Sequence, residues 1–142
     1  MASGLNSILY VEDDEMIWEV TLMALRDLGG FEVVHCPSGA AALEVAETFE
    51  PQMILLDVMM PGMDGPETFR RLRKMPSIAD VPIVFMTAKV QTHETAAYMA
   101  MGAAGVIPKP FDPMTIADDL RAIYADTAAC PSSSGAGVST AS

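Results

Sequence analysis

The sequence of 142 residues predicts a single α/β domain with a parallel sheet that is covered by helices on both faces. Two observations lead to this fold class. Short apolar runs alternate with segments of helical periodicity along most of the chain, and the runs are nearly continuous, as in strands that are buried on both faces. Hydrophobic residues make up 51% of the chain, which is enough for one real core and excludes disorder for most of it.

The first half of the chain predicts three strands and two helices. The strands are the short apolar runs at residues 8–11, 31–34 and 53–56. A first helix follows from residues that recur at helical spacing and face inward, namely Ile17, Val20, Thr21, Ala24 and Leu28. It should end at Gly29 and Gly30, because glycine is a common stop signal for a helix. Ser38 can cap a second helix, which continues to about residue 49 before Pro51 breaks it.

The second half predicts two more strands and three more helices. The strands lie at residues 82–86 and 105–107, and the helices at about residues 66–74, 92–101 and 112–124. Pro66 can open the third helix, and Pro82 takes the first position of a strand, where proline is tolerated. Gly102 ends the fourth helix, and Asp112 caps the fifth. The inward residues of this last helix are Ile116, Leu120, Ile123 and Tyr124.

The composition changes at about Asp126. Residues 1–125 contain all of the periodic segments, whereas residues 126–142 are mostly small and polar and have no periodicity. We therefore predict one domain at residues 1–125, followed by a flexible Ser/Gly/Ala-rich tail or the stub of a linker at residues 126–142.

The charge balance and the cysteines exclude several classes of protein. Eight basic against nineteen acidic residues give a formal net charge of −11, which argues against direct binding of nucleic-acid phosphates. The N-terminus lacks a basic segment followed by a long apolar one, and no apolar run approaches about eighteen residues. We therefore expect a cytoplasmic protein without a membrane span. Cys36 and Cys130 match no metal-binding spacing and are expected to be reduced and unpaired.

Chemically distinctive residues fall where the predicted strands end, and in a parallel sheet these ends share one edge. They are Glu12 and Asp13 after the first strand, Asp57 after the third, Thr87 after the fourth and Lys109 after the fifth. Three carboxylates only about 4–6 Å apart repel one another by a few kcal/mol per pair at an effective dielectric of about 20. Lys109 supplies one positive charge, so the site needs a further cation. Oxygen ligands with room for water suit Mg²⁺ or Mn²⁺.

Asp57 is the residue on which these groups converge, and its position at the end of a buried strand predicts a reactive role. A carboxylate beside a divalent cation can act as the nucleophile toward phosphorus and form an aspartyl-phosphate. The metal and Lys109 would offset the charge on the transferring phosphoryl group, and the hydroxyl of Thr87 can reach one of its oxygens. The small side chain of Ala88 would leave the approach open.

Four motifs make the chain similar to a known family. VEDD, LLDVMMPGMDG, PIVFMTA and IPKPF occur in this order and at family spacing. Over roughly residues 7–125 the chain resembles the receiver domains of two-component response regulators, of the chemotaxis-regulator type. The resemblance implies a doubly wound (βα)5, flavodoxin-like three-layer sandwich with a parallel sheet of strand order 2-1-3-4-5. It also implies phosphorylation of Asp57 by a histidine kinase or a histidine phosphotransfer protein, and no enzyme activity beyond self-catalysed phosphoryl transfer and autodephosphorylation.

The resemblance also assigns roles to single residues. It implies that the metal ligands are Glu12, Asp13, Asp57 and the backbone carbonyl of Met59. Thr87 matches the switch hydroxyl and Lys109 the phosphoryl-binding lysine, whose bond to Pro110 is commonly cis in receivers. Met59 and Lys89 hold family positions that tune the lifetime of the phosphate.

Val106 departs from the family pattern, because many receivers have an aromatic switch residue three positions before the lysine. Valine has no ring to bury and one strongly preferred rotamer in many settings. We therefore expect a modest response, centred on residues 87–93 and the first turn of the fourth helix, where Tyr98 is the nearest aromatic alternative. A partner should read the face of the fourth helix, fifth strand and fifth helix, or the side of the first helix that bears Trp18.

Other residues allow a functional and a structural interpretation. Trp18 should lie on the first helix near the acidic pair, either as a partly exposed partner contact or packed on a neighbouring helix. His35 and His93 lack partners at ligand spacing, so we do not expect them to bind metal or accept phosphate. Most methionines should fill the core, whereas a soft docking rim is expected from three methionines of one loop, Met59, Met60 and Met63.

The sequence favours a single-domain phosphoacceptor protein, but two other interpretations stay open. The chain could be the excised receiver of a longer transcription factor or enzyme, or a pseudo-receiver that binds partners without phosphate. A pseudo-receiver predicts a broken acidic pair, aspartate or lysine, and none is broken. A flavodoxin-like cofactor binder is disfavoured because acidic residues follow the first strand. The kinase, the downstream protein target and a phosphorylation-dependent homodimer are left open.

Overall fold

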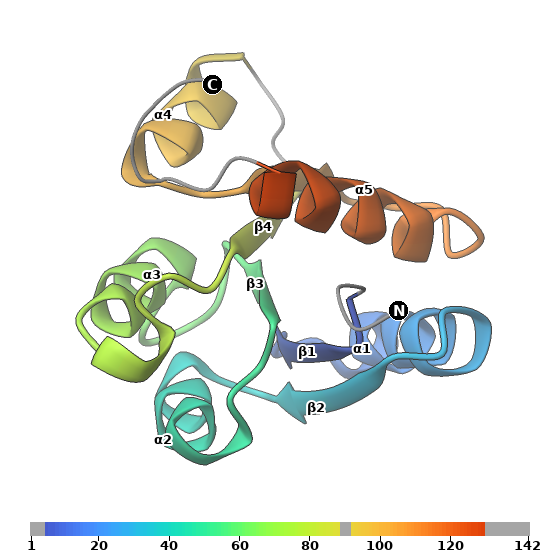
Figure 1. Cartoon of the computed structure of the whole chain (residues 1–142), viewed down its shortest axis with the longest axis horizontal. Coiled ribbons are helices and arrows are strands. Elements are labelled where there is room, and N and C mark those ends of the chain that lie inside the picture. The colour runs from blue at the N-terminus through green and yellow to red at the C-terminus, as the bar shows by residue number, and fades with distance from the viewer. Residues whose placement is uncertain (1–4, 89–91, 130–142) are drawn as a thin grey trace.

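The computed structural model describes residues 5–88 and 92–129. They form a parallel sheet of five strands in the order β2-β1-β3-β4-β5, with helices on both faces. Figure 1 shows α1 and α5 on one side of the strands and α2 and α3 on the other. This arrangement confirms the predicted α/β class, the three layers and the strand order.

The elements alternate as the sequence predicted. The strands are β1 (Ser7–Val11), β2 (Glu32–Cys36), β3 (Met53–Asp57), β4 (Ile83–Thr87) and β5 (Gly105–Pro108). The α-helices are α1 (Glu15–Leu22), α2 (Gly39–Phe49), α3 (Gly65–Arg73), α4 (Thr92–Met101) and α5 (Ile116–Ala129). Two short helices complete the set, the π-helix η1 (Met23–Leu28) and the 3₁₀-helix η2 (Pro76–Ile78). Observed strand ends lie within two residues of the predicted ones.

Side-chain caps fix where several helices begin. Ser38 accepts a hydrogen bond from the Ala41 amide at 3.1 Å and caps α2, as predicted. Asp64 accepts one from the Glu67 amide at 2.9 Å and caps α3. Asp112 accepts one from the Met114 amide at 2.9 Å, in the turn that leads into α5. Ser38 and Asp64 each satisfy an amide that the first helical turn leaves unpaired. Asp112 does not cap α5 as predicted, because that helix begins only at Ile116.

The first helix differs from the prediction in its inward face. Val20 is 41% exposed and Leu28 is 53% exposed, so the expectation that both point inward is wrong. The buried line consists of Thr21, Ala24 and Leu25, at positions i, i+3 and i+4. Thr21 and Ala24 were predicted to face inward, whereas Leu25 was missed. The wider π-helical turns of η1, closed by the Gly29 amide on the Ala24 carbonyl at 2.9 Å, rotate Leu28 away from the core.

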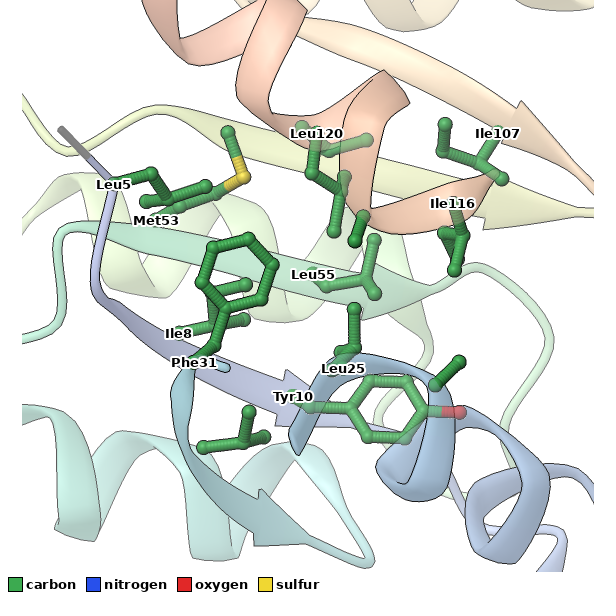
Figure 2. Close-up of a cluster of buried hydrophobic side chains, with 14 of the residues drawn as sticks. Leu5, Ile8, Tyr10, Leu25, Phe31, Met53, Leu55, Ile107, Ile116 and Leu120 are labelled. Atoms are coloured by element: carbon green, nitrogen blue, oxygen red, sulfur yellow. The ribbon is translucent and has the colours of Figure 1, made fainter. Parts of the chain in front are cut away.

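Two apolar clusters lie on opposite faces of the sheet. Figure 2 shows the cluster between the sheet and the α1 and α5 side, with labelled residues such as Tyr10, Leu25, Phe31, Ile116 and Leu120. The second cluster lies under α2, α3 and α4 and includes Leu56, Phe69 and Phe85. Both faces of β1, β3 and β4 are buried, so packing on each side holds these strands in place. Because the strands are parallel, their carboxyl ends meet at one edge of the sheet.

The last helix is longer than the sequence predicted, and one cysteine lies in the core. Helix α5 continues to Ala129, so the boundary expected after residue 125 falls inside a helix, while residues 130–142 lie outside the described part of the chain. Cys36 is buried and forms no disulfide, and Cys130 is outside the described residues. Among residues 5–88 and 92–129, no helix is both long and apolar enough to span a bilayer.

Candidate functional site

Three carboxylates gather at the carboxyl edge of the sheet. Glu12 and Asp13 follow β1, and Asp57 is the last residue of β3. Each offers an oxygen, and these oxygens lie within 4.8 Å of one another. Glu12 and Asp57 are buried, whereas Asp13 is exposed to solvent. The set therefore has the oxygen donors and the open side that a partly hydrated divalent cation requires, and the predicted convergence of these residues is confirmed.

Lys109 joins two of these carboxylates. Its Nζ lies 2.7 Å from Asp57 Oδ1 and 3.2 Å from Glu12 Oε1. Its backbone amide donates to the Thr87 carbonyl at 2.9 Å, which ties the loop after β5 to the end of β4. The bond between Lys109 and Pro110 is cis, as the resemblance implied. Lys109 is the only basic side chain that pairs with the acidic cluster in the described part of the chain.

Burial disfavours the charged forms of the residues in this site and shifts their pKa values. Burial, reinforced by the charge of Asp57, raises the pKa of Glu12 to about 7. Burial also raises the pKa of Asp57, although the hydrogen bond from Lys109 opposes this effect. Burial disfavours the charged lysine as well, but hydrogen bonds and the charges of Asp57 and Glu12 outweigh it, and the pKa of Lys109 is raised. A single lysine thus leaves excess negative charge, which fits a site for a divalent cation.

The remaining predicted site residues lie around this cluster. Thr87 ends β4 and is buried at the same edge. Met59, two residues after Asp57, has a side chain that is 65% exposed. The expectation that Met60 joins an exposed rim is wrong, because Met60 is only 8% exposed and packs in the core cluster under α2 and α3. Met63 is half-buried, with its sulfur beside Gly39. Lys89 lies outside the described residues.

Gly65 shapes the loop after Asp57, a role that sequence analysis did not single out. Its amide donates to the Val58 carbonyl at 2.9 Å and closes the loop. A Cβ atom at this position would lie 2.5 Å from the carbonyl oxygen of Asp57, so any side chain would displace the backbone of the candidate nucleophile. The Asp-Gly pair in the sequence indicated a turn, but only the fold shows this close approach to Asp57.

An aromatic group beneath the acidic pair was also missed. The ring of His35 lies 4.2 Å from that of Trp18 and 5.5 Å from that of Tyr10, between centroids. His35 Nε2 lies 2.9 Å from the carbonyl oxygen of Glu12, and burial lowers the pKa of this histidine. Trp18 is half-buried on α1 and packs against His35 of strand β2, a partner that neither interpretation of Trp18 named. Sequence analysis placed Trp18 near the acidic pair, but only an isolated tyrosine and histidine within apolar strands indicated the rest of this group.

The opposite face of the sheet has a different aromatic group next to Thr87. Phe85 lies two residues before Thr87 on β4, and its ring is 4.9 Å from Tyr98 and 5.5 Å from Phe69. Val106 is half-buried on β5 and packs against the same cluster. His93 is exposed on α4 and is not part of the acidic cluster.

Comparison with known proteins identifies the family. The model of the response regulator receiver domain matches residues 8–121. The chain is 37% identical to the transcriptional regulatory protein CseB of Streptomyces avermitilis over 117 residues, which are 82% of this chain and 48% of CseB. It is 36% identical to the alkaline phosphatase synthesis transcriptional regulatory protein PhoP of Bacillus subtilis over 119 residues, covering 83% of this chain and 48% of PhoP. The chain thus spans about half the length of these curated relatives.

Solved structures show the same similarity. The chemotaxis protein CheY4 of Vibrio cholerae superposes with a TM-score of 0.78 at 29% identity, covering 84% of this chain and 98% of CheY4. A putative response regulator from Chloroflexus aurantiacus superposes with a TM-score of 0.77 at 30% identity, covering 85% of this chain and 98% of that protein. The chain belongs to the response regulator receiver domains of two-component signal transduction.

Proposed function

We propose that this domain accepts a phosphoryl group on Asp57 and passes the resulting change to a partner protein. The observation that carries the proposal is the contact of Lys109 Nζ with Asp57 Oδ1 at 2.7 Å, inside a cluster whose oxygens lie within 4.8 Å. A buried carboxylate that faces both a lysine and a divalent-cation site is suited to attack phosphorus. The proposed donor is a phosphohistidine on a histidine kinase or on a histidine phosphotransfer protein.

The transfer exchanges one bond to phosphorus for another. An oxygen of Asp57 bonds to phosphorus while the bond from phosphorus to the imidazole nitrogen of the donor breaks. The imidazole leaves with that electron pair and takes a proton from solvent. In autodephosphorylation, water attacks phosphorus, the Asp57 carboxylate is the leaving group, and inorganic phosphate is released. The domain is therefore not an enzyme toward other substrates in this proposal.

The residues around Asp57 have separate tasks in the proposed transfer. Glu12, Asp13, Asp57 and the backbone carbonyl of Met59 would hold the cation, with Mg²⁺ as our choice and Mn²⁺ as the alternative. The cation would offset charge on the phosphoryl group. Lys109 would move from the carboxylate to a phosphoryl oxygen, and the Thr87 hydroxyl would hydrogen-bond to another. Because Lys109 is joined to β4 through its amide, its movement would also pull on the loop after Thr87.

We also propose where the domain works and what it controls. We place the domain in the cytoplasm, where kinases of this system present their phosphohistidines. The length of the curated relatives, which are named as transcriptional regulators, favours a second candidate in which this domain controls a DNA-binding output outside these residues. An antibody raised against the domain would separate the two: stand-alone protein gives a band of about 142 residues in the source cell, and a regulator gives one about twice as long. That the receiver itself binds no nucleic acid stays a prediction, as does a phosphorylation-dependent homodimer.

Asp57→Asn tests the central step. Wild-type protein incubated with acetyl phosphate and Mg²⁺ should gain one phosphoryl group by intact mass, and the variant should gain none, because an amide is not a nucleophile toward phosphorus. Asp27→Asn, on an exposed position of η1, is the matched control and should label normally. Labelling of the Asp57 variant at the wild-type level, or full labelling of wild type in excess chelator, would overturn the proposal.

A further inference from the structure

Tyr10 lies under the acidic pair and has an unusual hydrogen-bonding state. Its side chain is completely buried, and its hydroxyl makes no well-formed hydrogen bond with any of the residues that the structure describes. Burial of an unpaired hydroxyl is unfavourable, and folded proteins retain few such groups. Figure 2 shows the Tyr10 ring at one end of its cluster, with the hydroxyl directed away from Phe31. The hydroxyl therefore requires an explanation that apolar packing does not give.

The side chains of Thr21 on α1 and of Glu12 are close enough to interact with this hydroxyl, and the charge of Asp57 acts on it as well. The Thr21 hydroxyl already donates its proton to the Ile17 carbonyl at 2.8 Å, so toward Tyr10 it can only accept. A Glu12 carboxylate can likewise only accept. Tyr10 is thus a single donor placed beside two acceptors, one structural and one in the candidate metal site.

The Glu12 carboxylate is held away from Tyr10 by other contacts. Lys109 Nζ lies 3.2 Å from Oε1, and the Asp14 amide donates to Oε2 at 3.3 Å. The Tyr10 ring has little freedom to follow, because it is packed among buried residues and lies 5.5 Å from the His35 ring. His35 in turn contacts the Glu12 carbonyl at 2.9 Å. The aromatic group therefore supports Glu12 rigidly, and the movable part is the carboxylate.

We propose that Tyr10 is a positioning residue for Glu12: when Lys109 leaves Glu12, the Tyr10 hydroxyl donates a hydrogen bond to the carboxylate and fixes it for a divalent cation. The inference deepens the proposed function and rests on it only for the role of the cation. Residues that hydrogen-bond to a metal ligand orient it, and their loss commonly weakens metal binding by about 10–100-fold. Tyr10 fits this role because it is a rigid, buried donor whose hydroxyl has no well-formed hydrogen bond among the described residues.

Tyr10→Phe removes only the oxygen atom and is the direct test. By isothermal titration with MgCl2, the variant should bind Mg²⁺ about 10-fold more weakly than wild type. Its thermal unfolding midpoint in excess chelator should be equal or higher, because a buried unpaired hydroxyl has been removed. Tyr124→Phe is the matched control, since its half-buried hydroxyl accepts a bond from Gln52 Nε2 at 3.4 Å, and it should bind Mg²⁺ normally.

A double-mutant cycle separates positioning from a general structural effect. If Tyr10 acts through Glu12, Tyr10→Phe should have no further effect on Mg²⁺ affinity in a Glu12→Gln background. Equal Mg²⁺ affinity of Tyr10→Phe and wild type, equal weakening by the control, or full additivity with Glu12→Gln would each overturn the inference. At saturating Mg²⁺ the variant should still accept phosphate from acetyl phosphate. If wild-type protein bound Mg²⁺ but never gained a phosphoryl group, the proposed function would be contradicted. The Mg²⁺ affinities of wild type and Tyr10→Phe could still be compared.

Discussion

The two faces of the sheet each have one aromatic group beside the acidic site, and the two groups differ in chemistry. The group on the α1 and α5 side has polar atoms on each ring and consists of Tyr10, His35 and Trp18. The group on the α3 and α4 side is a stack built mainly from hydrocarbon rings and consists of Phe69, Phe85 and Tyr98. The first touches Glu12 directly, whereas the second supports the strand that ends at Thr87.

This difference suggests that binding and response are supported from opposite faces. Polar rings can hold a ligand residue by hydrogen bonds, so changes there should alter affinity for the cation. Apolar rings contribute mainly by burial, so changes there should alter stability and the packing of α4. One expectation concerns cation affinity and the other concerns stability, so variants on the two faces can separate them.

The largest expected effect is at Lys109, the basic residue of the acidic site. Lys109→Met removes the charge that contacts Asp57 and Glu12, so the rate of labelling by acetyl phosphate should fall by about 100-fold, as when a single charge-stabilising donor is lost from an active site. The rate is followed by intact mass at a fixed Mg²⁺ concentration. Lys74→Met, on an exposed side chain at the end of α3, should leave the rate unchanged. A Lys109 variant that labels at the wild-type rate would show that the lysine is only structural.

A second, smaller effect is expected on the apolar face. Phe85→Ala should lower the free energy of unfolding by about 3–5 kcal/mol, because a fully buried phenyl ring is lost from the stack. Urea unfolding in excess chelator measures this change. Mg²⁺ affinity of the folded variant should remain close to that of wild type, which is the opposite pattern to Tyr10→Phe. A loss of Mg²⁺ affinity as large as that of Tyr10→Phe would break the division between the two faces.

These groups also show what the sequence could and could not predict. The sheet, its order and the convergence of Glu12, Asp57 and Lys109 were predictable, because strand ends are marked by apolar runs and motifs at fixed spacing. The hydrogen bond between His35 and the Glu12 carbonyl and the position of the Tyr10 hydroxyl were not predictable, because they depend on contacts between elements far apart in the chain. The spacing of apolar residues indicates which face of a helix or strand is buried, but it does not show which atoms are in contact there.

Other errors have local causes. Met60 looked like part of an exposed loop, but this loop is closed by the Gly65 amide on the Val58 carbonyl, and Met60 packs in the second core cluster. Leu28 fitted the helical period, but the π-helical turns of η1 shift the face that points inward. In both places a change of backbone geometry, invisible to a pattern of apolar residues, decided the burial of a side chain.

The smallest expected effect is optical and tests the comparison directly. Trp18 is the only tryptophan of the chain, and its ring is 4.2 Å from His35, which contacts the carbonyl oxygen of Glu12 at 2.9 Å. A cation held by Glu12 should therefore change the environment of Trp18 through a single intervening ring, and Mg²⁺ alone should change its emission slightly. The matched reporter is Tyr98→Trp combined with Trp18→Phe, which places the indole on the opposite face next to Phe85. The emission of that reporter should not change with Mg²⁺ alone. It should change only when beryllofluoride, a phosphoryl analogue, is added, because the response at Thr87 and α4 requires the phosphoryl group. A flat Trp18 signal while calorimetry shows Mg²⁺ binding, or equal Mg²⁺ responses from both reporters, would mean that the two faces are not separate and that the acidic site communicates with both of them at once.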